Sequence, residues 1–174
     1  EHLATLTPEP AGGRIVELGA GDGTLMLSVA QRLAERWQRM KVVLLDQQSL
    51  VSAETRDAFQ AFGWELETVK ADVFDWLRSD AANGNEVIIT NLFLHHFSDQ
   101  RLSELLHHAA GRTRSFVACE PRRSPLPLTV SHLLFLIGCN SVTRHDAVIS
   151  VRAGFRDQEL STMWPNDGKW RMRE

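Results

Sequence analysis

Short apolar runs and amphipathic stretches alternate along residues 13–121. Five of the runs are rich in β-branched and apolar residues, which is typical of buried strands. These strands are predicted over residues 13–19, 41–46, 64–72, 85–91 and 114–121. An alternation of strands and helices predicts right-handed βαβ units, and hence a parallel sheet covered by helices on both faces.

The segments between the strands have helical periodicity. In the first of them, Met26, Val29, Ala30, Leu33 and Trp37 fall on one helical face. Helices are therefore predicted over residues 24–40, 49–63, 74–80 and 98–111. A serine near the start of two of these helices and a glycine at their ends agree with capping preferences.

The regular alternation of strands and helices ends beyond residue 121. Two very apolar or amphipathic segments predict helices over 127–139 and 144–155, and two short runs predict strands over 157–165 and 168–174. The expected fold class is therefore α/β, a doubly wound, mostly parallel, seven-stranded Rossmann-like sheet with its final strand pair compressed or partly absent. The 174 residues fit a single domain spanning 1–174, without internal repeats or a linker.

Composition narrows the classes of function. A net charge of −3 argues against a general nucleic-acid binder, which normally carries a basic surplus. The longest strongly apolar stretch, 133–139, is far shorter than a membrane span needs. Two cysteines, Cys119 and Cys139, without a CxxC spacing fit a reducing compartment and no structural metal site. These features predict a cytoplasmic protein.

Three glycines follow the first strand in "IVELGAGDGTL". Gly19, Gly21 and Gly23 permit a tight turn and let a ligand lie against bare backbone. The dinucleotide fingerprint requires a glycine or alanine where this chain has Thr24, and no GK[ST] follows for a Walker loop. The glycine loop therefore matches the NAD-binding fingerprint only weakly, and it is not a Walker-type phosphate loop.

Two carboxylates bear on the ligand. Glu17 precedes the glycine loop, where it would repel a pyrophosphate but attract a cation such as the sulfonium or ammonium of S-adenosylmethionine. Asp46, at the tip of the second strand, can accept hydrogen bonds from ribose hydroxyls, which NAD also offers. Asp46 has an alternative interpretation as the cap of the next helix.

Five motifs in order, "VELGAGDGTL", "VVLLD", "KADVFDW", "IITNLFLHHFSD" and "SFVACEP", make the core at 15–121 resemble the class I S-adenosylmethionine-dependent methyltransferases. The resemblance implies the cofactor S-adenosylmethionine. It also implies roles for individual residues: Glu17, Gly19 and Gly21 at the methionine part, Gly23 in the same cofactor-binding loop, Asp46 at the ribose, Gln47, Asp72 and Val73 at the adenine, and Asn91 and Leu92 at the sulfonium. Asp72 has an alternative role as the cap of the helix that follows it.

The candidate general bases are His95 and His96, in the segment that the resemblance places opposite the sulfonium. Histidine can take a proton near neutral pH, although either ring can instead serve only in packing. The sequence "NLFL" replaces the N/D-P-P-Y/F motif of methyltransferases that act on exocyclic amino groups or glutamine amides. This difference favours a small, apolar or aromatic acceptor, methylated at oxygen or carbon.

Two other functions stay open at this point. An NAD-dependent oxidoreductase is disfavoured by Thr24 and Glu17, and by the absence of tyrosine from the chain. A non-catalytic methyltransferase-like scaffold is disfavoured only by the retained cofactor residues. The apolar helix predicted over 127–139 fits three roles: core packing, the lining of an acceptor pocket, or the face of a homodimer.

Overall fold

The computed structural model describes residues 13–82, 84–123, 154–165 and 167–173, without the side chains of residues 85 and 86. By its internal contacts the chain divides into two compact units. Among the described residues, the first unit comprises 13–91 and 107–118, and the second comprises 92–106 and the residues from 119 onward. The prediction of a single domain over 1–174 stays a prediction.

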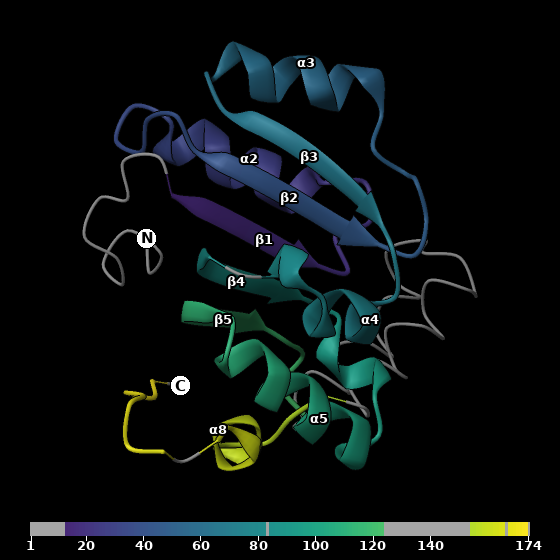
Figure 1. Cartoon of the computed structure of the whole chain (residues 1–174), viewed down its shortest axis with the longest axis vertical. Coiled ribbons are helices and arrows are strands. Elements are labelled where there is room, and N and C mark those ends of the chain that lie inside the picture. The colour runs from purple at the N-terminus through teal and green to yellow at the C-terminus, as the bar shows by residue number, and fades with distance from the viewer. Residues whose placement is uncertain (1–12, 83, 124–153, 166, 174) are drawn as a thin grey trace, which may run out of the picture. The chain divides into compact units, whose positions relative to one another are not determined.

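Five strands and the helices between them follow the predicted alternation (Figure 1). The strands are β1 (Arg14–Leu18), β2 (Lys41–Asp46), β3 (Glu65–Lys70), β4 (Asn85–Asn91) and β5 (Thr113–Cys119). The helices are α2 (Thr24–Leu33), α3 (Ala53–Ala61), α4 (Val73–Arg78), α5 (Asp99–Ala110) and α8 (Glu159–Met163), with short 3-10 turns η1 (Asp80–Ala82) and η2 (Leu94–His96).

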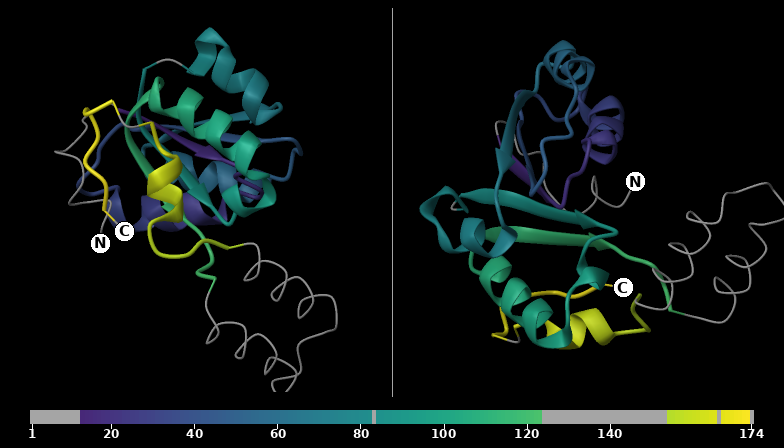
Figure 2. Two further views of the ribbon diagram at one scale, coloured as in Figure 1. Left: turned by 90° about the horizontal axis from the view of Figure 1, so that it is seen from below. Right: turned by 90° about the vertical axis from the view of Figure 1, so that its right-hand side faces the viewer.

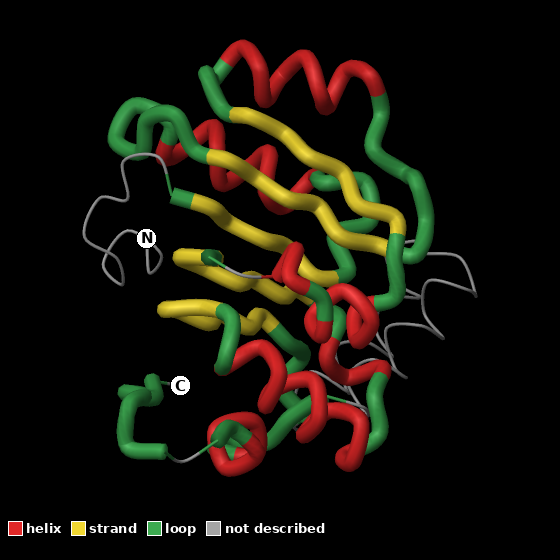
Figure 3. The backbone as a smooth tube through the Cα atoms, viewed as in Figure 1, coloured by secondary structure: helices red, strands yellow, loops and turns green. Residues whose placement is uncertain are grey.

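The strands form one sheet in the order β3-β2-β1-β4-β5, which Figure 3 shows as a row of yellow tubes. β1 pairs in parallel with both β2 and β4, and β2 pairs in parallel with β3. The chain therefore builds outward from β1 in one direction and then restarts on its other side with β4. In open sheets of this kind, ligands bind at the carboxyl ends of the strands where the order reverses. The loop after β1 lies at that end.

The core of the first unit comes from apolar strand residues that alternate between the two faces of the sheet. Ile15, Val42 and Leu44 belong to a buried cluster that also holds Met26 of α2 and Phe59 of α3. α2 and α4 lie on opposite faces of the sheet, as the two directions of view agree (Figures 1 and 2). The α/β class with a parallel sheet and helices on both faces is thus confirmed.

The first predicted helix is too long. α2 ends at Leu33, although the periodic pattern runs to residue 40. Trp37 and Met40 are nevertheless fully buried, and the Trp37 carbonyl accepts a 2.8 Å hydrogen bond from Nε1 of Trp64. The apolar spacing therefore reflects burial of an irregular segment, in which Arg39 adopts a φ of 55°, rather than a continued helix.

The seven-stranded sheet is not shown, because the described residues contain five strands. The strand predicted over 157–165 is wrong: these residues contain α8 instead. Glu159 in its first turn accepts a 2.8 Å hydrogen bond from the Arg156 backbone N–H, and this local contact favours a helical turn. Glu159 also pairs with Arg123. Residues 168–173 form no strand. The helices predicted over 127–139 and 144–155 fall outside the described residues, apart from the last two positions of the second.

The described part of the chain contains no helix with both the length and the apolar character that crossing a membrane requires. Within the same residues, no group of three or more histidine, cysteine or carboxylate side chains is arranged to hold a metal ion.

Candidate functional site

The loop after β1 is held in an unusual backbone conformation. Gly19, Gly21 and Gly23 all have positive φ, at 70°, 56° and 81°. The N–H groups of Gly19 and Ala20 donate to the Leu45 carbonyl at 2.9 and 3.0 Å, so the loop is fastened to the end of β2. Gly23 is the N-cap residue of α2, and a Cβ there would lie 2.6 Å from the Leu44 side chain. The glycines are therefore conformationally required, and the loop is preformed.

Asp46 connects this loop to the next one. Its Oδ2 accepts a 2.9 Å hydrogen bond from the Gly21 N–H, and its Oδ1 accepts one of 2.9 Å from the Gln48 N–H. The alternative role of Asp46 as a helix cap is wrong, because Ser52 caps α3 through the Thr55 N–H. Each carboxylate oxygen has a second lone pair, so both can still accept a hydrogen bond from a ligand hydroxyl.

Glu17 is a buried acid with an unpartnered oxygen. The residue is only 2% exposed, and its Oε2 has no hydrogen-bond partner among the described residues. Burial, followed by the charges of Asp22 and Asp46, raises the pKa of Glu17 from 4.5 to about 8. Unpartnered buried polar atoms are rare in proteins and call for an explanation. A cationic or hydrogen-bond-donating ligand at this loop would supply the missing partner.

Asp22, in contrast to Glu17, is exposed, and its pKa is lowered rather than raised. Hydrogen bonds from Thr24, including a 3.0 Å contact from its N–H to Oδ1, lower the pKa of the Asp22 carboxyl. Asp22 therefore stays ionised beside the glycine loop, and its charge is one of the causes that keep the Glu17 proton in place. The loop region is negative, and it contains no cation in contact with Glu17 or Asp46 among the described residues. This donor set fits a positively charged ligand better than a phosphate.

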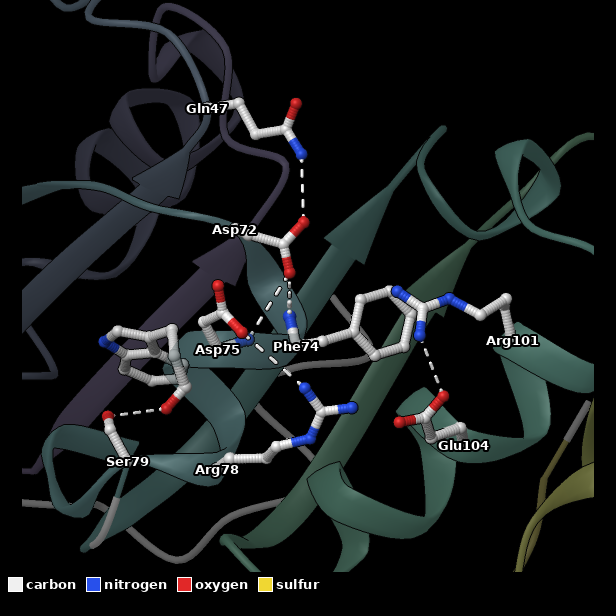
Figure 4. A network of polar contacts seen from close by, with 9 residues as sticks. Gln47, Asp72, Phe74, Asp75, Arg78, Ser79, Arg101 and Glu104 are labelled. Carbon is white, nitrogen blue, oxygen red and sulfur yellow. Dashed lines mark hydrogen bonds and ion pairs between the residues drawn. The ribbon is translucent and has the colours of Figure 1, made fainter.

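Gln47 and Asp72, both predicted for the adenine, lie together in the structure. Gln47 Nε2 donates to Asp72 Oδ2 at 3.1 Å (Figure 4). The other oxygen of Asp72 accepts from the Phe74 N–H at 2.8 Å and the Asp75 N–H at 3.3 Å. The alternative role of Asp72 as the cap of α4 is thereby confirmed. Val73, the first residue of α4, is buried.

The end of β4 carries an unusual backbone as well. Asn91 is its last residue, and Leu92 follows with a φ of 51°. A leucine in the left-handed region is uncommon and costs about 1–2 kcal/mol. Its N–H donates to the Cys119 carbonyl at 2.9 Å, and 53% of the residue is exposed. The positive φ of Leu92 has no signal in the sequence, since leucine does not favour it.

His95 is held by a residue that the sequence analysis missed. Its Nδ1 lies 2.8 Å from Oε2 of Glu120, and both side chains are almost fully buried. Oε1 of Glu120 accepts hydrogen bonds from the N–H groups of Phe93 and Leu94, at 2.9 and 2.8 Å. The signal for Glu120 was available: an acid ends the apolar run "SFVACEP", just as Asp46 ends "KVVLLD".

His96 differs from its neighbour. The residue is exposed, and its ring lies 4.2 Å from that of His95, centroid to centroid. Partial desolvation and the neighbouring His95 lower the pKa of His96, against smaller raising effects of Glu120 and the Leu92 backbone. The two candidate bases are therefore close together, but only His95 is oriented by a carboxylate.

Comparison with known proteins gives a consistent result. Residues 15–115, more than half of the chain, match the model of a family described as a methyltransferase domain. The ribosomal RNA small subunit methyltransferase C of Chromohalobacter salexigens is 33% identical over 91 residues, which are 52% of this chain and 24% of that protein. The chain thus spans about a quarter of the length of this curated relative.

Solved structures show the same fold at low identity. The CMeT domain of the citrinin polyketide synthase gives a TM-score of 0.56 at 15% identity, covering 86% of this chain and 35% of that one. Magnesium protoporphyrin IX methyltransferase from Synechocystis PCC 6803, solved with bound SAH, gives 0.52 at 16% identity, covering 87% and 61%. With the family match, the glycine loop and the sheet order, the chain belongs to the methyltransferase domain family, the class I S-adenosylmethionine-dependent methyltransferases.

Proposed function

We propose that the protein binds S-adenosylmethionine and transfers its methyl group to an oxygen or carbon of a small, apolar or aromatic acceptor. The observation that carries the cofactor half of the proposal is Glu17, a buried acid with an unpartnered oxygen next to a preformed glycine loop. The cofactor supplies an activated methyl group on a sulfonium, and its ammonium is the kind of cation that Glu17 lacks.

Ten residues would hold the cofactor. Glu17, Gly19, Gly21 and Gly23 would surround its methionine part, Asp46 its ribose, Gln47, Asp72 and Val73 its adenine, and Asn91 and Leu92 the region of its sulfonium. The loop bonds of Asp46 support its part, since they orient the carboxylate while leaving lone pairs for a diol. Asp72 caps α4 through Oδ1, which leaves Oδ2 to accept a hydrogen bond from the adenine, although Oδ2 already accepts one from Gln47 Nε2.

Of the two histidines, we propose that His95 is the general base and that His96 serves only in packing. A general base must be held within reach of the proton it removes, and the ring of His95 is fixed by a buried carboxylate. His96 is exposed, and its lowered pKa makes it a weaker base than an ordinary histidine.

The nature of the base limits the acceptor. A neutral imidazole removes a proton readily only from a fairly acidic group, such as a phenol, an enol or a carbon flanked by carbonyls. The relative from Chromohalobacter acts, by its name, on ribosomal RNA, but this chain covers only 24% of it and has a net charge of −3. We therefore keep a small-molecule acceptor in the proposal, together with a cytoplasmic location and, as a further part, a homodimer.

The cofactor proposal is tested by calorimetric titration of the purified protein with S-adenosylmethionine, S-adenosylhomocysteine and NAD. We expect binding of the two adenosyl ligands and none of NAD. Binding of NAD alone would overturn the interpretation of Glu17 and the glycine loop. If the adenosyl ligands bind but no phenolic or enolic acceptor is methylated, the acceptor half of the proposal is wrong and the scaffold alternative gains support.

A further inference from the structure

The turn after β4 is fastened to the end of β5 by a run of contacts. The N–H of Leu92 donates to the Cys119 carbonyl, and the next two N–H groups, of Phe93 and Leu94, donate to Glu120 Oε1. Three successive backbone groups are therefore satisfied by two adjacent residues. Glu120 has only one oxygen engaged in this task, and its second oxygen, Oε2, contacts the imidazole of His95.

The contact of Glu120 Oε2 with His95 bears on which imidazole nitrogen carries the proton. A carboxylate accepts hydrogen bonds and does not donate them, so the hydrogen in the 2.8 Å contact belongs to Nδ1 of His95. In the neutral ring the proton on Nδ1 leaves Nε2 with a lone pair. No described residue hydrogen-bonds Nε2. Nε2 is therefore the nitrogen that can take up a proton.

We propose that Glu120 is a positioning residue that selects the tautomer of His95 with the proton on Nδ1, so that Nε2 serves as the proton acceptor in methyl transfer. The inference rests on the proposed function for its use, but the tautomer itself can be measured without any acceptor. Glu120 does not touch the reacting atoms in this proposal. It acts through the ring that it orients.

A purely structural role for Glu120 makes a different prediction. Fastening the turn needs only Oε1, since Phe93 and Leu94 both donate to that atom. A glutamine has the same shape, and its carbonyl oxygen could keep these two bonds. Its amide NH₂ would then face His95 and could only donate, so Nδ1 would have to accept and the proton would move to Nε2. The substitution Glu120→Gln therefore keeps the turn and reverses the tautomer.

His96 provides an internal comparison. Its ring lies next to that of His95 and is in contact with the Leu92 backbone, whereas the hydrogen-bonded contact with Glu120 is made by His95. We therefore expect the tautomer of His96 not to reverse in Glu120→Gln. Glu104→Gln is a matched control, because Glu104 is another glutamate in the second unit and pairs with Arg101 at 3.0 Å. It should leave both rings unchanged.

The test is ¹⁵N NMR of the imidazole nitrogens in the full chain at about pH 8, where an ordinary histidine is neutral. His95→Gln identifies the signals of His95 by their loss. In the wild type we expect Nδ1 to be protonated and Nε2 not, and in Glu120→Gln the reverse. A wild-type His95 with its proton on Nε2, or an unchanged pattern in Glu120→Gln, would overturn the proposal.

Two controls separate this inference from the function on which it rests. The wild-type spectrum alone decides the tautomer if Glu120→Gln does not fold. Calorimetry with S-adenosylhomocysteine on the same wild-type sample reports on the cofactor site independently, since none of the residues proposed to bind its adenosine lies in the Glu120 network. Failure to bind the cofactor with the expected tautomer would refute the proposed function and leave the role of Glu120 in orienting His95 intact.

Discussion

Oδ2 of Asp46 accepts a 2.9 Å hydrogen bond from the backbone N–H of Gly21, which joins the end of β2 to the glycine loop after β1. The Asp46 carboxylate, which the sequence predicts to bind a ribose, therefore also holds the glycine loop in place. A ligand that bonds to Asp46 therefore meets a group already held in place, so little conformational entropy is lost on binding.

Asp46→Ala should weaken binding of S-adenosylhomocysteine by about 1.5–3 kcal/mol, the scale of hydrogen bonds to a charged group. It should also lower the free energy of unfolding, since the N–H groups of Gly21 and Gln48 lose their acceptor. Calorimetry and urea unfolding measure the two effects. Asp57→Ala removes an exposed acid of α3 and serves as the control. Unchanged affinity in Asp46→Ala would refute the ribose assignment.

Glu17 should make the stability of the cofactor-free protein depend on pH. Folded Glu17 keeps its proton up to about pH 8, whereas in the unfolded chain it releases it near 4.5. The folded state therefore binds more protons between these values, and the free energy of unfolding should fall as pH rises through this window. The slope that Glu17 contributes is at most about 1.4 kcal/mol per pH unit.

Glu17→Gln is the matched variant, because glutamine is neutral at every pH and has the same size. His96, whose pKa is lowered, contributes a slope of the opposite sign, but it is present in both proteins. The difference between the two urea-unfolding curves across pH 4.5–8 therefore isolates Glu17. A difference that does not change with pH would show that Glu17 is ionised throughout and has a partner.

Gly23→Ala should destabilise the protein more than Gly21→Ala. Both positions have positive φ, which costs an alanine about 1–2 kcal/mol. At Gly21 the new methyl group meets no atom within 4 Å, whereas at Gly23 it would lie 2.6 Å from the buried Leu44 side chain. The overlap should add about 1–3 kcal/mol. Equal losses in urea unfolding would mean that Leu44 moves aside freely.

Asp72→Ala should lower stability by about 0.5–2 kcal/mol through loss of the α4 cap. Asp72→Asn keeps one acceptor oxygen and should recover most of this. Asp75→Ala is the control, since its contact with Arg78 is an exposed ion pair of 3.6 Å worth at most about 1 kcal/mol. If Asp72→Asn folds like the wild type but binds S-adenosylhomocysteine more weakly, the carboxylate has a role in binding beyond the cap.

His95→Gln should reduce turnover of a phenolic or enolic acceptor by about 10²-fold or more, the usual contribution of a general base. His96→Gln should change it far less, because His96 is exposed and not oriented by a carboxylate. Transfer of a labelled methyl group from S-adenosylmethionine measures both. The opposite ranking of the two variants would assign the base to His96.

Local patterns sufficed for much of the fold and the glycine loop. Apolar runs of four to six residues rich in β-branched side chains are typical of strands buried in a covered sheet, and their regular alternation with helices favours parallel pairing. Gly19, Gly21 and Gly23 are informative for a similar reason, since a backbone with positive φ selects glycine directly. Such preferences act within a few residues and can therefore be found without the tertiary structure.

Hydrophobic periodicity alone gave wrong predictions where a segment is short or irregular. Trp37 and Met40 continued the helical pattern because they are buried, although α2 ends at Leu33. Residues 157–165 were predicted as a strand but contain α8, whose first turn has a hydrogen bond from the Arg156 N–H to the Glu159 carboxylate. Short apolar runs are ambiguous between helix and strand until their tertiary partners are known.

The sequence by itself therefore determined the five parallel strands, the glycine loop and the family, because these depend on local residue preferences and on motif order. Only the tertiary structure decided how the polar residues of the site work. Glu120 meets His95 across 25 positions of sequence, as Asp46 meets Gly21, because parallel strands bring their carboxyl ends to one edge of the sheet. Which oxygen of a carboxylate faces which donor is a matter of atomic geometry, and no spacing in the sequence encodes it.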